Sequence, residues 1–178
     1  MKKIKKIILT GAPGTGKSSI INKLKENNYK CFNEVWDENF KNPSTNKDSN
    51  QIIDFSRFLF DERKKHFEIN EIESNFKKNI IFYDRSLIDI ISYLKTYNKS
   101  FPKEWTNYIN LKYYYNKVFY CPLWSEIYVK NKMRLEEYDE TINIDKNMRK
   151  LYKELNYNII EIPKKSINER VEFILDNI

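Results

Sequence analysis

A short glycine-rich segment near the start of the sequence carries the most specific chemistry. It runs from Gly11 to Ser18, reads GAPGTGKS, and matches the pattern G-x-x-x-x-G-K-[ST]. The chain has only 3 glycines, and all of them lie in this segment. Glycine lets backbone N–H groups approach phosphate oxygens closely, and a helix that begins after the segment adds the positive end of its dipole. The segment therefore predicts a site for nucleotide phosphates.

Two side chains of this segment have expected roles of their own. Lys17 would reach the β- and γ-phosphates, and the Ser18 hydroxyl would bind Mg²⁺. The expected nucleotide is ATP, with GTP as the alternative. The predicted phosphate-binding residues are Gly11, Ala12, Pro13, Gly14, Thr15, Gly16, Lys17, Ser18 and Ser19.

Asp84 follows the apolar run 79–83, in the Walker B arrangement that places a carboxylate beside Mg²⁺. Arg85 comes next. A mechanochemical ATPase would usually have glutamate there, to polarise water, and a small GTPase would usually have Asp-x-x-Gly. An arginine beside the metal carboxylate is better suited to orient an anionic or hydroxyl acceptor. We therefore expect Asp84 and Arg85 to serve phosphoryl transfer.

Glu34 ends a short segment in which a second strand is expected. Acceptor-binding groups of doubly wound sheets lie at such strand ends, and a carboxylate there could take a proton from an attacking hydroxyl. The alternative is a surface glutamate in a turn. Aromatic residues could line an acceptor pocket or simply form core: Trp36, Phe55, Phe58 and Tyr93. Arg57 could contact an acidic substrate.

A cationic segment follows the fourth expected strand and contains Lys130, Lys132 and Arg134. Kinases often place a mobile cationic lid here, which closes over the transferring phosphoryl group. Arg134 is the preferred lid residue. The alternative is a solvated charged helix, because Glu136 and Glu137 follow directly.

Composition bounds the class of protein. The chain has 178 residues, 40% hydrophobic and 15% aromatic, enough for a core and too apolar for a disordered chain. Its 2 cysteines exclude a disulfide scaffold, and no apolar run approaches the roughly 18 residues of a membrane span. The net charge of +7 is compatible with nucleic acid or anionic lipid, but solvated lysine-rich faces are favoured. We expect a cytoplasmic protein and leave its oligomeric state open.

The elements that must position these residues alternate along the chain. Apolar runs predict strands over 4–10, 29–34, 79–83, 117–121 and 157–162. Helical spacing predicts helices over 17–27, 51–77, 86–97, 103–115, 143–156 and 166–176, with 124–141 helical in part. The segment 51–77 is expected to form one long helix or two consecutive ones. This alternation predicts an α/β domain with a parallel sheet, and a single domain over 1–178.

The sequence resembles a known family in the segments 10–19, 84–93, 118–120 and 168–175, together with Glu34 and Arg134. These are the compact P-loop "AAA domain" ATP-binding proteins, whose architecture is nucleotide-kinase-like despite the label. They are similar to nicotinamide riboside kinase domains and, more distantly, to thymidylate and deoxynucleoside kinases. Ser56 and Asp61 stand where relatives tend to have glutamine.

The resemblance implies a three-layer P-loop NTPase fold. Its five-stranded parallel sheet has the order 2-3-1-4-5, with helices on both faces and a kinase-like lid at about 123–141. It also implies ATP or GTP at 14–18, magnesium at Ser18 and Asp84, and an acceptor near Glu34 and Arg85.

These residues together predict Mg²⁺-dependent phosphoryl transfer from ATP to a nucleoside- or nucleotide-like acceptor. Lys17, Asp84, Arg85, Glu34 and Arg134 are the expected catalytic residues. Two other functions stay open. One is a regulatory ATP- or GTP-binding protein or slow NTPase without a small-molecule acceptor. The other is a basic accessory protein whose nucleotide gates nucleic-acid or lipid binding.

Overall fold

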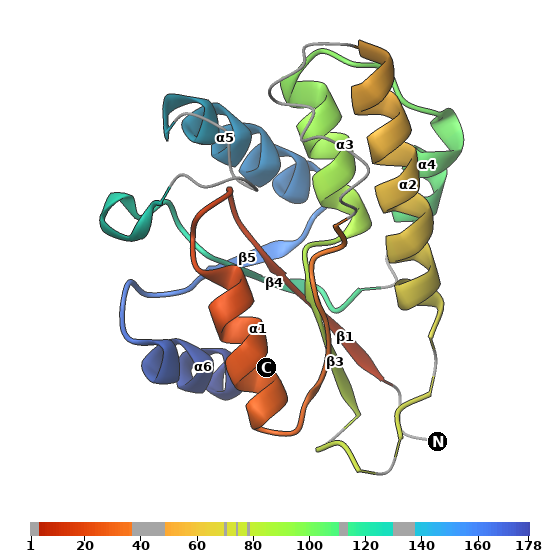
Figure 1. Cartoon of the computed structure of the whole chain (residues 1–178). Coiled ribbons are helices and arrows are strands. Elements are labelled where there is room, and N and C mark those ends of the chain that lie inside the picture. Colours follow the sequence, from red (N-terminus) through yellow and green to blue (C-terminus); the bar gives the residue numbers. More distant parts are fainter. Residues whose placement is uncertain are drawn as a thin grey trace.

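A five-stranded parallel sheet forms the centre of the molecule (Figure 1). The computed structural model describes residues 4–36, 49–69, 71–73, 75–77, 79–110, 114–129 and 138–178. The strands are β1 (Lys5–Thr10), β2 (Lys30–Phe32), β3 (Ile80–Asp84), β4 (Lys117–Tyr120) and β5 (Asn158–Glu161). Their order is β2-β3-β1-β4-β5. This order confirms the fold class expected from the resemblance.

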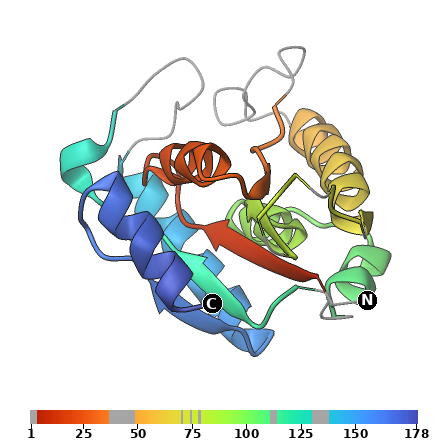
Figure 2. The ribbon, with the colours of Figure 1, turned by 90° about the horizontal axis from the view of Figure 1, so that it is seen from below.

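Helices cover both faces of the sheet, which completes the three layers. They are α1 (Lys17–Glu26), α2 (Ser49–Glu68), α3 (Leu87–Thr96), α4 (Lys103–Asn110), α5 (Tyr138–Glu154) and α6 (Ile167–Asp176), with a short 3₁₀ turn η1 (Ser125–Ile127). Helices α1 and α6 lie on one face, and α2 to α5 on the other (Figure 1). In the view from below, α6 and α2 lie on opposite sides of the molecule (Figure 2).

Strand β1 shows why the sheet has two cores. Successive side chains of a strand point to opposite faces. Ile7 and Leu9 therefore belong to the core beneath α1 and α6, whereas Ile8 belongs to the core beneath α2, α3, α4 and α5. All three side chains are buried. A strand buried on both faces reads as a continuous apolar run, as the sequence does here.

Two helices are shorter than helical spacing predicts, because the chain must leave them to enter a strand. The helix expected over 51–77 ends at Glu68. The Lys77 N–H then donates to the carbonyl of Asn28 beside the start of β2. The helix expected over 103–115 ends at Asn110, and the Tyr115 N–H donates to the Lys6 carbonyl of β1. These sheet contacts compete with further helical turns.

The strand order concentrates functional residues at one edge of the sheet. In parallel strands all carboxyl ends lie at the same edge, and ligands bind where the strand order reverses. Here the reversal occurs at β1, between β3 and β4. The glycine-rich segment follows β1, Asp84 ends β3, and Glu34 lies just beyond β2. No helix in the described ranges is both long and apolar enough to cross a membrane.

Candidate functional site

The glycine-rich segment 11–18, called the phosphate loop from here on, combines a positive φ with close packing at two of its glycines. Gly11 has φ of 142°, and a Cβ there would lie 2.3 Å from the Cys121 carbonyl oxygen. Gly16 has φ of 81°, and a Cβ there would lie 2.8 Å from Nη1 of Arg170. These glycines therefore allow other parts of the chain to pack directly against the loop.

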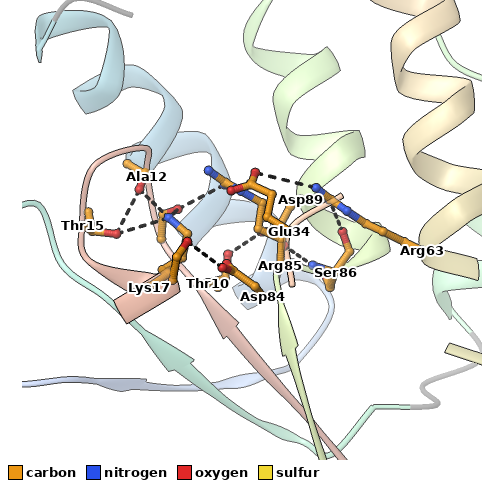
Figure 3. Close-up of polar contacts among 12 residues, drawn as sticks. Thr10, Ala12, Thr15, Lys17, Glu34, Arg63, Asp84, Arg85, Ser86 and Asp89 are labelled. Carbon is orange, nitrogen blue, oxygen red and sulfur yellow. Dashed lines mark hydrogen bonds and ion pairs between the residues drawn. The ribbon is translucent and has the colours of Figure 1, made fainter. Parts of the chain in front are cut away.

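Lys17 lies inside the phosphate loop and is only 4% exposed. Its Nζ donates to the carbonyls of Gly11 at 3.0 Å and Ala12 at 2.8 Å, and to Oγ1 of Thr15 at 3.3 Å (Figure 3). Burial, together with the charge of Arg85, lowers the pKa of Lys17 to about 8. The ammonium group thus lies where it could exchange a carbonyl partner for a phosphate oxygen.

Ser18 and Asp84 meet as the magnesium prediction requires. The Ser18 hydroxyl donates to Oδ2 of Asp84 at 3.0 Å. Oδ1 of Asp84 is buried and has no hydrogen-bond partner among the described residues. Burial, and then the charge of Glu34, raises the pKa of Asp84, so a cation at this carboxylate would relieve an unfavourable charge.

The donor set fits Mg²⁺. This ion takes hard oxygen ligands and is usually held by one or two protein groups plus phosphate and water. A serine hydroxyl and one carboxylate with a free buried oxygen supply that number. Across the ranges that the structure describes, no cluster of three or more His, Cys, Asp or Glu side chains could hold a metal ion.

Arg85 and Glu34 form an ion pair beside the phosphate loop. Nε of Arg85 donates to Oε1 of Glu34, and Nη1 of Arg85 contacts the Gly11 carbonyl at 3.3 Å (Figure 3). Loss of hydration would raise the pKa of Glu34, but Arg85, Lys17 and Arg63 hold it below its ordinary value. Glu34 is therefore an ionised carboxylate at neutral pH.

The backbone of Arg85 adopts an unusual conformation that the neighbouring turn maintains. Its φ is 73°, in the left-handed region, which is costly for a side chain with a Cβ and is often found at functional sites. The Arg85 N–H donates to the Leu9 carbonyl at 2.9 Å. Ser86 and Asp89 then cap α3 reciprocally.

The structure brings two further polar residues into the site: Arg63, which the sequence analysis did not single out, and Asp89, which it included only within the family-like segment 84–93. Arg63 of α2 is 7% exposed; Nη1 donates to the Ser86 carbonyl at 2.8 Å and Nη2 lies 4.0 Å from Oε1 of Glu34. Asp89 accepts from Oγ1 of Thr10 at 2.6 Å and from the Tyr152 hydroxyl at 3.2 Å. Arg63 lies two helical turns after Ser56 on the same helix, and this spacing was the available signal.

The charged side chains described above surround a cavity of about 470 Å³. Trp36, Phe55 and Tyr93 line it as the pocket alternative expected, and Phe58 does not. Arg57 is exposed and lies outside the lining. The cavity-lining residues used below are Lys17, Ser18, Glu34, Arg63, Asp84 and Arg85. The lid residues Lys130, Lys132 and Arg134 lie outside the described residues.

The sheet order, the phosphate loop and Asp84 at the end of β3 define a P-loop domain of nucleotide-kinase-like architecture. Residues 6–170 match the AAA domain family, and the chain belongs to that family. No protein among those of curated function matches it significantly by sequence.

Solved structures with this fold include nucleoside and nucleotide kinases. Deoxyadenosine kinase from M. mycoides with bound dATP has a TM-score of 0.71 and 18% identity, over 97% of this chain and 98% of that one. Thymidylate kinase from Candida albicans has a TM-score of 0.60 and 15% identity, over 98% and 91%. NadR in complex with NR has a TM-score of 0.63 and 18% identity, over 97% of this chain and 50% of NadR. At these identities the likeness establishes the fold.

Proposed function

We propose that the protein is an ATP- and Mg²⁺-dependent kinase whose acceptor is a hydroxyl of a small nucleoside-like molecule. The observation that carries this proposal is the Glu34–Arg85 ion pair, in the cavity that also holds Lys17, Ser18 and Asp84. The proposal treats 1–178 as one nucleotide-binding domain. It places the protein in the cytoplasm, where its two free cysteines stay reduced.

The donor side would bind the ATP phosphates. Lys17 would give up a loop carbonyl and donate to a β- or γ-phosphate oxygen, and loop N–H groups would hold the remaining charge. Ser18 and Asp84 would hold Mg²⁺, which when bound supplies charge neutralisation at the phosphate oxygens. Arg134 remains the proposed lid cation. GTP is the alternative donor.

The acceptor side supports transfer to a hydroxyl. The hydroxyl oxygen would attack the γ-phosphorus, the bond to the β–γ bridging oxygen would break, and ADP would leave. Glu34 would accept the hydroxyl proton, because its lowered pKa keeps it ionised. Arg85 would orient the acceptor. A phosphate-bearing acceptor is the alternative, but its charge would be repelled by the Glu34 carboxylate.

The shape of the cavity supports a nucleoside-like acceptor. Trp36 and Phe55, whose ring centroids lie 6.2 Å apart, line the same cavity as the charged groups. Aromatic side chains suit a flat ring, and the charged groups of the lining suit the hydroxyl of a sugar. The deoxyadenosine kinase of the same fold was solved with dATP bound, which also favours a nucleotide ligand.

A transfer assay with labelled ATP tests the proposal. We expect label on members of a nucleoside panel. In Arg85→Ala, transfer should fall about 100- to 1,000-fold while ADP affinity changes little. Arg57→Ala, an exposed arginine outside the cavity, is the matched control and should transfer normally.

Other outcomes support the rival functions. Nucleotide binding with slow hydrolysis and no labelled acceptor favours a regulatory protein or a slow NTPase. Binding of DNA, RNA or anionic vesicles that weakens steeply with salt favours the accessory role.

A further inference from the structure

The last helix places a buried arginine against the back of the phosphate loop. Arg170 lies one turn inside α6 and is only 3% exposed. A reciprocal cap between Ser166 and Glu169 fixes the start of this helix. Val171 and Ile174 share a core with Ile20 and Ile21 of α1, the helix that the phosphate loop opens. The guanidinium group is therefore held at a fixed position relative to the loop.

One contact of Arg170 sets the orientation of a loop peptide. Nη2 donates to the Thr15 carbonyl at 3.0 Å. The carbonyl and the N–H of one trans peptide unit point in opposite directions, so this bond directs the Gly16 N–H away from Arg170. The missing Cβ of Gly16 makes the approach feasible, because it would lie 2.8 Å from Nη1. Glycine at position 16 therefore allows both the close approach of Arg170 and the positive φ of the backbone.

The charge of Arg170 has no anionic partner within the described residues. None of the ion pairs in this part of the chain includes it, and its Nε is buried without a hydrogen-bond partner. Its other contacts carry no negative charge: the Trp124 ring lies 5.7 Å from the guanidinium carbon, and the neighbouring Cys121 is a neutral thiol, because burial raises its pKa to about 11. Arg149, by contrast, pairs with both Asp145 and Glu161 at 2.8 Å. A buried charge without a partner is costly unless an anion binds nearby.

We propose that Arg170 is a positioning residue of the donor-phosphate site. It holds the Thr15–Gly16 peptide with its N–H turned toward the phosphate, and the bound phosphates offset its buried charge. This inference rests on the proposed nucleotide binding. It assigns to α6, at the far end of the sequence, a part in phosphate affinity that the loop motif alone does not contain.

Three substitutions separate the contribution of the Arg170 charge from that of its hydrogen bond to the Thr15 carbonyl. Arg170→Met removes both the charge and the hydrogen bond, Arg170→Lys keeps the charge, and Arg170→Gln keeps a donor. Calorimetry with ADP and with inorganic tripolyphosphate measures the affinities. We expect Arg170→Met to weaken both ligands by about 10- to 100-fold and by the same factor, because the effect concerns phosphate. The Lys and Gln variants should fall between Arg170→Met and the natural protein.

The Tm of the nucleotide-free protein distinguishes a role of Arg170 in phosphate binding from a purely structural role. Replacing an unpaired buried charge by an apolar side chain should leave the Tm of the nucleotide-free protein unchanged or raise it. Arg149→Met, which breaks a paired arginine, is the control and should lower that Tm while both affinities stay within about twofold. In the transfer assay, Arg170→Met should raise the KM for ATP and leave the KM for the acceptor unchanged.

The proposal fails if folded Arg170→Met binds both probes within about twofold of the natural protein. If Arg170→Met does not fold, unaltered affinities in the Lys and Gln variants overturn it equally. Natural protein that binds neither probe overturns the proposed function and this inference together. If the natural protein binds both probes and the Arg170 variants bind them with unaltered affinity, only the proposed role of Arg170 is overturned.

Discussion

Lys17 combines a positive charge with almost complete burial, and this combination makes nucleotide affinity depend on pH. Burial and Arg85 lower its pKa from 10.5 to about 8. Phosphate binds the charged form, so the Kd for ADP should rise as pH increases above about 8, approaching tenfold per pH unit. Calorimetry between pH 7 and pH 9.5 measures this dependence. Lys17→Met should bind weakly with a nearly flat profile; an equally steep profile in that variant would assign the titration elsewhere.

The same pKa affects stability in the opposite direction. The unfolded chain keeps Lys17 protonated up to its ordinary pKa of 10.5, whereas the folded protein releases this proton near 8. Between these values the unfolded state binds more protons. The contribution of Lys17 to the free energy of unfolding therefore increases as pH rises through this window.

Glu34 is the residue at which the proposed chemistry is most directly testable. Its carboxylate pairs with Arg85 and lies 4.0 Å from Arg63. Glu34→Gln keeps the shape and removes the proton acceptor, so kcat should fall about 100- to 10,000-fold while the Kd for ADP stays the same. Steady-state kinetics with the labelled acceptor measures this change. A kcat near that of the natural protein would exclude Glu34 as the base.

At the scale of elements, α3 holds the strained Arg85 backbone in place. Ser86 caps the helix by accepting from the Ile88 N–H at 3.0 Å, and its hydroxyl lies 2.7 Å from that of Tyr152 in α5. The donor-side strand β1 joins the same network through Thr10 and Asp89. One buried network therefore connects β1, α3 and α5 next to Arg85.

The capping boxes that begin α3 and α6 allow a matched test of that network. Ser86→Ala loses a cap and a buried hydrogen bond, and should lower the free energy of unfolding by about 2–3 kcal/mol. Ser166→Ala loses only an exposed cap and should cost about 1 kcal/mol. Urea unfolding measures both. Ser86→Ala should also lower kcat through Arg85, and equal losses in the two variants would argue against the buried network.

At the scale of the whole molecule, the phosphate loop is packed between strands and helices that are distant in sequence. The residue that follows β4 touches it from one side, since a Cβ on Gly11 would lie 2.3 Å from the Cys121 carbonyl oxygen. Helix α6 touches it through Arg170. Segments that are distant in sequence therefore pack against the loop, and we expect the loop to tolerate few substitutions.

Gly11→Ala tests this close packing. The substitution adds a clash with backbone to a strained φ of 142° and should cost about 2–4 kcal/mol of stability. Asn28→Ala is the control, because Asn28 has a φ of 62° but is exposed, so only strain of about 1–2 kcal/mol applies. Thermal unfolding compares the two variants. A loss in Gly11→Ala no larger than in Asn28→Ala would show that the loop can move away from Cys121.

Local patterns in the sequence were sufficient to predict the parts of the site that consist of consecutive residues. The phosphate loop, the apolar strand before Asp84 and the alternation of strands and helices all depend on neighbouring residues, whose spacing expresses backbone geometry directly. The carboxyl ends of parallel strands share one edge, so the meeting of Ser18 with Asp84 followed from topology. The resemblance supplied the strand order, which spacing alone leaves open.

Only the tertiary structure revealed the contacts of Arg63, Asp89 and Arg170, although Asp89 and Arg170 lie in segments that carry the family resemblance. Arg170 reaches Thr15 across 155 positions of sequence, and Arg63 reaches Ser86 from another helix. Such contacts depend on how helices pack over a sheet. The spacing from Ser56 places Arg63 on the same helix face, but it does not give the partner on the other helix. The three glycines located the phosphate site from the sequence alone, but only the structure shows what packs against two of them, the Cys121 carbonyl after β4 at Gly11 and the Arg170 side chain of α6 at Gly16.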